Sequence, residues 1–259
     1  MIDRRELLET ARERGLTLAM VEKDYVLGWL LLGLSGIRGL VFKGGTALSK
    51  VYFPRLWRLS EDLDFVFLGD FRAVADSLEG SFAKAQEASG IVFSLRSSFS
   101  NPDYLQLKIR YDAILGRNWI KMDVTREAPI DRVAARPLAR AFTDYPPFKV
   151  RVESLEEIGA EKMRALVERK KSRDFYDVWH LLQLEVNQEK LRRLFLKKCA
   201  YKGIEFHGLD QILTPDVQSL LQGYWERELG RLVRPVPRLD IVLGELTKSL
   251  AFLESVQTP

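Results

Sequence analysis

Two short stretches decide the fold of this chain: residues 42–48, which read FKGGTAL, and residues 58–65, which read RLSEDLDF. In the first, a glycine pair follows an apolar run, and glycine lets backbone amides approach a phosphate more closely than a side chain would allow. In the second, Asp62 and Asp64 are two positions apart, so their carboxylates point from the same face of one strand. Oxygen ligands on one face suit Mg²⁺, which bridges protein carboxylates to substrate phosphates. Together the stretches predict a site that handles a nucleotide.

The composition limits the kinds of site that the chain can form. Its 259 residues, 46% of them hydrophobic, suffice for one large domain or two lobes. No apolar run reaches the roughly 20 residues that span a bilayer, so we expect no membrane partner. Cys199 is the only cysteine, which excludes an internal disulfide and fits a reducing, cytoplasmic location. His180 and His207 are the only histidines, so we expect aspartate oxygens to hold any metal ion.

The charge of the chain permits a polyanionic partner without requiring one. The net charge is +4 at pH 7, and the isoelectric point is about 9.1. Residues 169–173, which read RKKSR, could bind RNA phosphates or form a solvated helix face, and both interpretations stay open.

Residues 1–152 are expected to form a small mixed sheet with N-terminal helices. Thr17 is expected to cap the second of two helices, and Thr46 a helix that follows the glycine pair. The expected helices span about 3–14, 17–33, 46–53 and 71–88, the strands span 40–42, 62–68, 91–96, 104–111, 119–124 and 148–152, and a loop spans 126–147.

Residues 153–259 are expected to form a helical lobe. Ser154 and Glu157 form a capping box at the start of its first helix. Further helices are expected from about 171 and at 187–200, 214–229 and 239–255. The predicted fold class is therefore α/β (α+β), with a small mixed sheet followed by a helical lobe.

Three carboxylates form the strongest candidate site. Asp123 lies near the end of an apolar strand, where a carboxylate is unusual unless it has a specific role. With Asp62 and Asp64, it could hold two magnesium ions and orient an in-line attack on an α-phosphate, or accept the proton of the attacking hydroxyl. An Asp-x-Asp pair alone is usually a solvated strand edge, and the glycine pair upstream favours the metal site. We expect the three carboxylates to converge around one divalent ion.

The residues around these carboxylates each allow two interpretations. The glycine pair is not part of a Walker A loop, because the required G-x-x-x-x-G-K-[ST] pattern is absent, and such pairs often mark ordinary turns. Lys43 could reach a phosphate or lie at a strand end in solvent. Arg58 could clamp a phosphate or pair with a nearby carboxylate, and Ser60 follows it at the two-residue spacing of the carboxylates.

Three motifs, in this order, resemble those of a known family. They are KGGTAL at residues 43–48, RLSEDLDF at 58–65 and RDFYDVW at 173–179. They are similar to motifs of the AbiEii/AbiGii and MenT toxins, nucleotidyltransferases of the DNA polymerase β superfamily found in bacterial toxin–antitoxin and phage-abortive systems. The resemblance covers most of residues 20–185, and it implies that the sheet part is a nucleotidyltransferase core.

The resemblance implies a role for each matching residue. The glycine motif would face the triphosphate, Ser60 and the carboxylates of residues 62 and 64 match the metal-binding motif, and Lys162 would contact phosphate. Lys162 could instead face solvent, Asp174 could be a first-turn carboxylate favoured by the helix dipole, and Asp177 could pair with an arginine. Asp123, Lys43 and Arg58 come from the strand and charge patterns rather than from the resemblance. The candidate catalytic residues are then Asp62, Asp64, Asp123, Lys162 and Asp174, the first three also being metal ligands. The candidate nucleotide-binding residues are Lys43, Gly44, Gly45, Thr46, Arg58, Ser60, Lys162 and Asp177.

The expected activity is transfer of an NMP from an NTP to an acceptor, with Mg²⁺ or Mn²⁺ as cofactor and release of pyrophosphate. The resemblance implies a tRNA 3′ end as acceptor, which would block aminoacylation and arrest growth, and a cognate antitoxin as partner. One alternative is a nucleotide-binding toxin module without transfer activity, and a measurement of pyrophosphate release would separate it from a transferase. Another alternative is an enzyme that nucleotidylates protein, and a screen of acceptors with labelled NTP would separate it from an enzyme that acts on RNA.

Overall fold

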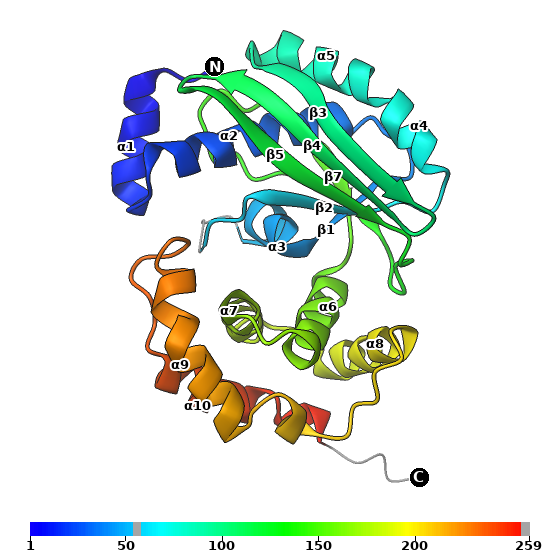
Figure 1. The fold of residues 1–259 in the computed structure, drawn as a ribbon, viewed down its shortest axis with the longest axis vertical. Coiled ribbons are helices and arrows are strands. Elements are labelled where there is room, and N and C mark those ends of the chain that lie inside the picture. The colour runs from blue at the N-terminus through cyan, green and yellow to red at the C-terminus, as the bar shows by residue number, and fades with distance from the viewer. Residues whose placement is uncertain (54–57, 255–259) are drawn as a thin grey trace. The chain divides into compact units, whose positions relative to one another are not determined.

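The structure, a computed structural model, describes residues 1–53 and 58–254, and the expected helix end at residue 255 lies outside this part. Two compact units make up the chain, Met1–Glu153 and Ser154–Pro259. The first contains a mixed sheet with helices and the second is helical, as Figure 1 shows. The predicted fold class is therefore confirmed. In the described part of the chain, no helix is both long enough and apolar enough to cross a membrane.

Seven strands form the sheet of the N-terminal unit. They are β1 (Val41–Lys43), β2 (Asp62–Val66), β3 (Val92–Asn101), β4 (Tyr104–Ala113), β5 (Gly116–Thr125), β6 (Ala134–Pro137) and β7 (Lys149–Val152). Their order across the sheet is β3-β4-β5-β2-β1-β7-β6. Strand β2 pairs in parallel with β5 and antiparallel with β1. Strand β2 is therefore an interior strand of the sheet, with a neighbouring strand on each side.

Hydrophobic side chains alternate along the strands and define a buried face of the sheet. Leu107 and Met122 are fully buried, whereas the neighbouring Gln106 and Lys121 are only half-buried. Helices α2 (Leu18–Leu34) and α5 (Leu78–Ser89) pack on each other and contact β4 and β3, respectively. Helix α1 (Arg4–Arg14) packs on α2, and helix α4 (Phe71–Asp76) packs on α5. The polar side chains lie on the other face, which we call the open face.

A buried ionic cluster fixes the segment that follows the glycine pair. Helix α3 (Gly44–Ala47) continues into a π-helical turn, Leu48–Tyr52. Lys50 in this turn is buried, and its Nζ lies 2.7 Å from Asp24 Oδ1 on α2, while Arg14 Nη1 lies 3.2 Å from Asp24 Oδ2. A buried carboxylate is tolerated when it is paired and hydrogen-bonded, so this cluster holds the segment after the glycine pair against α2.

Three sequence-based expectations were wrong in detail. Thr46 does not cap a helix: it lies inside α3, and its hydroxyl donates to the carbonyl of Asp62. The single helix expected at 71–88 is two helices, α4 and α5, which meet at Ser77. The loop expected at 126–147 contains strand β6, which pairs with β7. Thr17 does cap α2, as predicted, and accepts a hydrogen bond from the backbone N–H of Met20.

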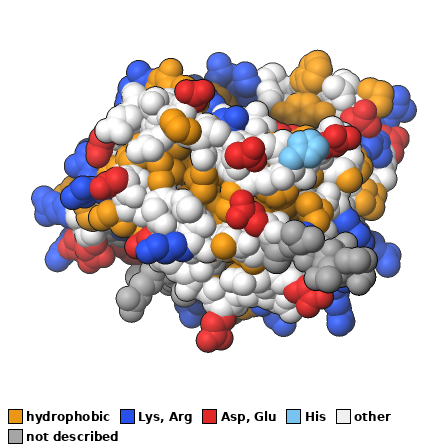
Figure 2. All heavy atoms as spheres, turned by 90° about the horizontal axis from the view of Figure 1, so that it is seen from below, with side chains coloured by type: hydrophobic (Ala, Val, Ile, Leu, Met, Phe, Trp, Pro, Cys, Tyr) orange, Lys and Arg blue, Asp and Glu red, His pale blue; other side chains and the backbone are white. Residues whose placement is uncertain are grey.

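The C-terminal unit is built from five main helices in the described part of the chain. They are α6 (Leu155–Glu168), α7 (Ser172–Leu181), α8 (Gln188–Tyr201), α9 (Pro215–Leu229) and α10 (Leu239–Ser249). Ser154 caps α6, as predicted, by accepting a hydrogen bond from the backbone N–H of Glu157. The carboxylate of Glu157 instead pairs with the fully buried Lys198 of α8, at 2.8 Å. In the view from below, hydrophobic side chains extend across the middle of the molecular face (Figure 2).

Candidate functional site

The parallel pairing of β2 with β5 brings the three candidate carboxylates onto one face. Asp64 is the register partner of Asp123, and Asp62 is the partner of Lys121. Register partners project to the same face of a sheet, and so do residues two apart on one strand. Asp62, Asp64 and Asp123 therefore share the open face. The side chains of Asp62 and Asp123 are 36% and 15% exposed, so solvent and ligands reach them.

The glycine pair lies directly against this group. Gly44 has a φ of +76°, and a Cβ at this position would lie 2.4 Å from Asp64 Oδ2. A Cβ on Gly45 would lie 2.4 Å from Arg58 Nη2 and 3.2 Å from Ser60 Oγ. Neither position has room for a side chain. The glycines thus let the backbone contact the Asp64 carboxylate and the Arg58 guanidinium closely.

The remaining predicted nucleotide-binding residues of this unit lie in the same region. Lys43 is buried and is the register partner of Asp64, so its side chain starts on the open face. The hydroxyl of Thr46 lies 2.8 Å from that of Ser60 and joins the glycine segment to the approach of β2. Arg58 is also buried, and its Nη1 donates to the carbonyl of Leu59 at 2.8 Å. The structure therefore gathers the N-terminal candidates, and it excludes the exposed strand-end position considered for Lys43.

Lys121 is a member of this site that the sequence did not single out. Its Nζ lies 2.9 Å from Asp123 Oδ2 and 3.5 Å from Asp62 Oδ2. Tyr104 donates its hydroxyl to Asp123 Oδ1 at 2.7 Å, and Gln106 donates Nε2 to the same oxygen at 3.2 Å. Both oxygens of Asp123 are thus held by donors. The one sequence signal for Lys121 is its position two residues before Asp123.

The local electrostatics keep these donors protonated at neutral pH. Partial burial alone would lower the pKa of Lys121, but its hydrogen bond to Asp123 and the charges of Asp62, Asp123 and Asp64 outweigh burial and raise that pKa. Burial, followed by the hydrogen bond to Asp123, raises the pKa of Tyr104 to about 12. Lys121 is therefore an ammonium ion beside the carboxylates, and Tyr104 is a neutral hydroxyl donor.

The donor chemistry of this face fits a magnesium ion. Mg²⁺ takes carboxylate oxygens, and Asp62, Asp64 and Asp123 supply them from two adjacent strands. Gly44 has no side chain, so its backbone lies directly against the Asp64 carboxylate, where a Cβ would clash. Among residues 1–53 and 58–254, however, no three His, Cys, Asp or Glu side chains are grouped closely enough to hold a metal ion. Lys121 lies between Asp62 and Asp123 and supplies the positive charge there, so convergence around a metal stays a prediction.

The C-terminal candidates form a separate buried cluster within their own unit. Lys162 Nζ on α6 lies 3.0 Å from Asp174 Oδ1 and 2.8 Å from Asp177 Oδ2, both on α7. Arg169 donates Nε and Nη2 to the two oxygens of Asp174, at 2.8 and 2.9 Å. Both aspartates are fully buried and Lys162 is 8% exposed. The structure thus excludes the solvent-facing alternative for Lys162, and it pairs Asp177 with a lysine.

Asp174, within this cluster, stays ionised over the physiological pH range. Burial alone would raise the pKa of Asp174, but the positive charge of Lys162 and the hydrogen bonds and charge of Arg169 outweigh it, so that pKa lies well below its usual value. Lys162 and Arg169 carry two positive charges against the two negative charges of Asp174 and Asp177. The cluster is therefore neutral as a whole, which makes its burial tolerable.

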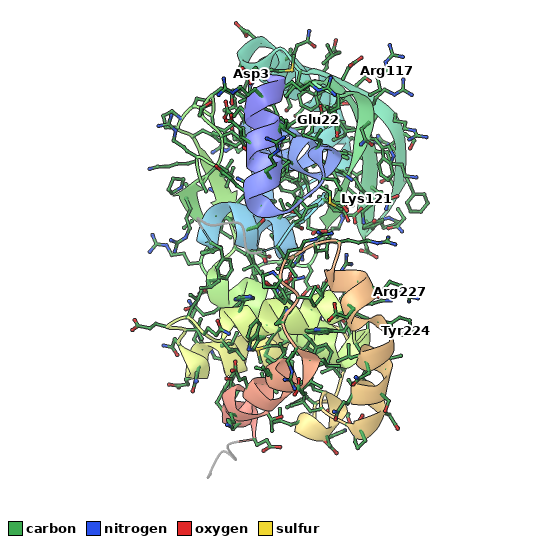
Figure 3. The ribbon with its side chains drawn as sticks, turned by 90° about the vertical axis from the view of Figure 1, so that its left-hand side faces the viewer. Asp3, Glu22, Arg117, Lys121, Tyr224 and Arg227 are labelled. Atoms are coloured by element: carbon green, nitrogen blue, oxygen red, sulfur yellow. The ribbon has the colours of Figure 1, made fainter. Side chains whose placement is uncertain are left out.

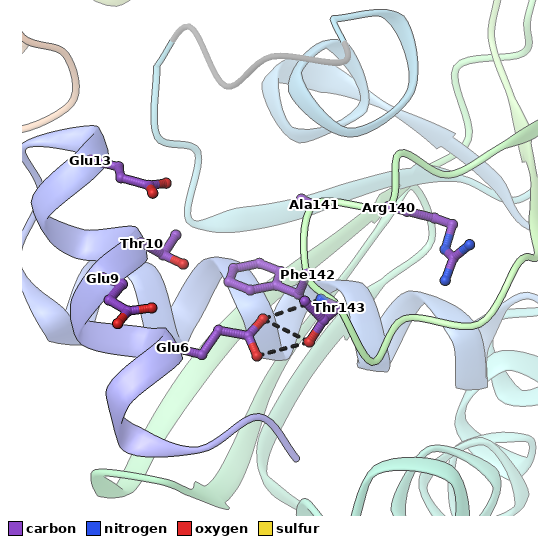
Figure 4. Close-up of a pocket in the computed structure, with 8 residues that line it drawn as sticks. All are labelled: Glu6, Glu9, Thr10, Glu13, Arg140, Ala141, Phe142 and Thr143. Carbon is purple, nitrogen blue, oxygen red and sulfur yellow. Dashed lines mark hydrogen bonds between the residues drawn. The ribbon is translucent and has the colours of Figure 1, made fainter.

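A hollow elsewhere on the N-terminal unit does not belong to the candidate site. It lies between α1 and residues 140–143, has a volume of about 490 Å³ and contains none of the candidate residues (Figure 4). Glu6, in its wall, accepts hydrogen bonds from the Thr143 hydroxyl at 2.8 and 2.9 Å. Glu9 and Glu13 make the wall acidic, which disfavours a phosphate ligand.

Comparisons with known proteins give a family match and structural matches for this chain. The family model described as "Nucleotidyl transferase AbiEii toxin, Type IV TA system" matches residues 37–249. Among solved structures, MenT4, a nucleotidyltransferase toxin from Mycobacterium tuberculosis H37Rv, is similar with a TM-score of 0.77 and 21% identity, over 100% of this chain and 91% of that one. JHP933 from Helicobacter pylori is similar with a TM-score of 0.62 and 17% identity, over 92% of this chain and 94% of that one. No curated protein sequence gives a significant match.

Proposed function

The chain belongs to the AbiEii family of nucleotidyl transferase toxins of type IV toxin–antitoxin systems, and we propose that it transfers an NMP from an NTP to the 3′ end of a tRNA. Membership of this family makes the chain a nucleotidyltransferase and implies an NTP substrate and an antitoxin partner. The further elements of the proposal are the tRNA acceptor, the Mg²⁺ cofactor with Mn²⁺ as a substitute, and action in the cytoplasm, where NTPs and tRNA are found.

One observation carries the proposal: the register pairing of Asp64 with Asp123 beside Gly44. We assign Asp62, Asp64 and Asp123 as the carboxylates that hold magnesium, which when bound neutralises charge on the triphosphate and orients it. The attacking hydroxyl oxygen forms a bond to the α-phosphorus, and the bond to the β-phosphate oxygen breaks. Pyrophosphate leaves, and the proton of the hydroxyl passes to a carboxylate of the open face, a role that we assign to Asp123.

The positively charged and small residues around the carboxylates are assigned to the triphosphate. Gly44 and Gly45 are assigned to bring backbone amides close to phosphate oxygens, and Lys43 and Arg58 to supply positive charge. Thr46 and Ser60 supply the hydroxyl groups of this segment. All of these residues belong to the N-terminal unit.

The Lys162 cluster is assigned to nucleotide binding in the C-terminal unit. An ammonium group has three N–H donors, and two of those of Lys162 point at Asp174 and Asp177. We assign the third to a phosphate oxygen. In this assignment Asp174 and Asp177 act by positioning Lys162, because both are fully buried.

Labelled substrates test the proposal. We would incubate the protein with each NTP, labelled at the α-phosphate, and with total tRNA and MgCl₂, and measure label in RNA together with pyrophosphate release. We expect both signals with at least one NTP, and neither without divalent metal. Label on protein, or pyrophosphate without labelled RNA, would contradict the tRNA acceptor. Binding of NTP without pyrophosphate release would show a nucleotide-binding module instead.

A further inference from the structure

The open face extends beyond the carboxylates over β5, β4 and β3. Trp119 lies two residues before Lys121 on β5 and is the register partner of Arg110 on β4. Lys108 is the partner of Lys121, and Phe99 on β3 is the partner of Gln106. Register partners point to the same side, so these residues share the face of Asp123. We call Arg96, Phe99, Lys108, Arg110 and Trp119 the acceptor patch.

Positive charge is concentrated around one aromatic ring of this patch. The ring centroid of Trp119 lies 5.5 Å from Lys108 Nζ, 5.9 Å from Arg96 Cζ and 5.6 Å from Lys23 Nζ. The electron-rich ring attracts each cation, whereas the cations repel one another. Lys23 is paired with Glu61 at 3.5 Å. Within residues 1–53 and 58–254, no carboxylate forms a salt bridge with Arg96, Lys108 or Arg110.

An exposed aromatic ring lies at the end of the patch nearest Asp123. Phe99 is 58% exposed, and its ring centroid lies 6.5 Å from that of Tyr104, whose hydroxyl donates to Asp123. A phenylalanine so exposed on a sheet gains little for folding, because most of its apolar surface stays in water. It offers a flat surface on which a planar group can stack.

The patch has a length that suits a short strand of nucleic acid. Residues 104–110 of β4 run from Tyr104 to Arg110, a distance of about 20 Å at ~3.4 Å per residue. Figure 3 labels Lys121 and Arg117 at separate points along β5, which runs beside β4. Arg117 is already paired with Asp112, at 3.2 Å. The positive side chains of the acceptor patch that have no salt bridge within the described part of the chain therefore extend along the sheet only as far as Arg110.

We propose that the unpaired 3′-terminal nucleotides of an RNA acceptor lie across the acceptor patch, with a base stacked on Phe99 and phosphates at Lys108, Arg96 and Arg110. Exposed aromatic rings interleaved with unpaired cations are the features that bind single-stranded nucleic acid, since bases stack and phosphates pair. A base-paired duplex offers phosphates but no free base face to Phe99.

This placement explains how an acceptor reaches the carboxylates. Phe99 and Tyr104 adjoin Asp123, so a strand stacked there presents its terminal hydroxyl to the residues that hold the reacting phosphate. The inference rests on the proposed function for the identity of the acceptor. The RNA-binding surface itself does not depend on transfer taking place.

Binding measured without chemistry tests the inference. We would titrate the full-length protein, without divalent metal, into a fluorescent single-stranded RNA that ends in a free 3′ hydroxyl and follow anisotropy. We expect Phe99→Ala to weaken binding by about 5- to 100-fold, because the stacked base then has no aromatic partner. Lys108→Gln combined with Arg96→Gln should reduce the slope of log K against log salt by about 1.4, or ~0.7 for each phosphate that the protein no longer neutralises.

Matched surface variants serve as controls. Leu68 is 59% exposed, and Arg72 is an exposed arginine on α4, so Leu68→Ala and Arg72→Gln should leave RNA binding unchanged. Equal affinity of the patch variants and the wild type for RNA would overturn the inference, and so would equal affinity of the wild type for a blunt duplex. If the patch variants lost NTP affinity but kept their RNA affinity, the inference would also be overturned, because the patch would then hold the triphosphate.

The two failures are distinguishable. If the wild type transfers label to RNA while the patch variants bind RNA normally, the inference is wrong and the proposed function stands. If the wild type transfers no label but the patch variants bind RNA more weakly than it does, the surface stands and the acceptor assignment fails.

Discussion

At the scale of single residues, Gly44 is the position where the backbone limits the site most strictly. A Cβ there would lie 2.4 Å from Asp64 Oδ2, and the φ of +76° disfavours any other residue. We predict that Gly44→Ala displaces the Asp64 carboxylate, abolishes transfer and lowers the free energy of unfolding by about 1–2 kcal/mol.

Gly80 is the matched control for this change. It lies in helix α5, and a Cβ there would meet nothing within 4 Å. Gly80→Ala should therefore keep full activity and raise stability by about 0.5–1 kcal/mol. Chemical denaturation and labelled-NTP assays measure both variants. Full activity of Gly44→Ala would mean that Asp64 is not held by this contact.

Lys121 balances the charge of the carboxylate face. Its ammonium lies between Asp62 and Asp123, so a magnesium ion bound by these carboxylates would compete with Lys121 for the same oxygens. We predict that Lys121→Met lowers the Tm of the metal-free protein, because the carboxylates then repel one another. Added MgCl₂ should raise the Tm of this variant more than that of the wild type.

Thermal unfolding with and without MgCl₂ measures this effect. Lys84 is an exposed lysine on α5, and Lys84→Met should respond to magnesium as the wild type does. An identical magnesium shift for Lys121→Met and the wild type would show that Lys121 does not compete with the metal.

Part of the site could be predicted at this scale and part could not. The two-residue spacing of Asp62 and Asp64 fixes their common face whatever the rest of the fold does. Lys121 escaped prediction because its pairing with Asp62 depends on the register of β5 against β2, and those strands are separated by a long stretch of chain. The assignment of the carboxylates as metal ligands stays a prediction.

At the scale of secondary-structure elements, Lys162 ties α6 to α7. Its ammonium pairs with Asp174 and Asp177, and both carboxylates are fully buried. We predict that Lys162→Met lowers the free energy of unfolding by about 3–5 kcal/mol, because it removes the ammonium group that the two buried carboxylates share. Lost activity in this variant alone therefore does not identify a phosphate contact.

A second substitution separates the two roles of Lys162. Adding Asp177→Asn to Lys162→Met removes one uncompensated charge and should restore part of the stability. Urea denaturation gives the stability, and calorimetry gives the NTP affinity of the folded protein. If the double variant is folded and binds NTP as tightly as the wild type, Lys162 is purely structural.

Elements with strong local signals were predicted well. The alternation of Leu105, Leu107 and Ile109 with polar residues predicted β4, and the cap at Ser154 predicted the start of α6. Strand β6 was missed because it is a four-residue edge strand that ends in Pro137, so its sequence has neither length nor periodicity. Thr46 was misassigned because its hydroxyl has a tertiary partner, the carbonyl of Asp62, which outweighs its capping propensity.

At the scale of the whole molecule, the buried Asp174 contributes to the response of stability to low pH. The pKa of Asp174 is depressed in the folded state, so its unfolded form binds protons first as the pH falls below about 3.9. Its contribution to stability is therefore present from neutral pH down to about pH 4 and is lost as the pH falls further. We predict that Asp174→Asn is less stable at pH 7 but loses less stability between pH 4 and pH 3. Urea denaturation measures the free energy of unfolding at each pH. An equal loss of this free energy between pH 4 and pH 3 in the wild type and in Asp174→Asn would contradict the prediction.

The central claim for the molecule is that the carboxylates of β2 and β5 carry the transfer chemistry. The most direct measurement is magnesium-dependent pyrophosphate release by Asp64→Asn, compared with Asp76→Asn, which changes an exposed carboxylate at the end of α4. The account predicts that Asp64→Asn loses pyrophosphate release entirely, with a Tm equal to or above that of the wild type because carboxylate repulsion is relieved, and that Asp76→Asn keeps wild-type turnover. Wild-type turnover by folded Asp64→Asn would contradict the account and place the chemistry elsewhere on the chain.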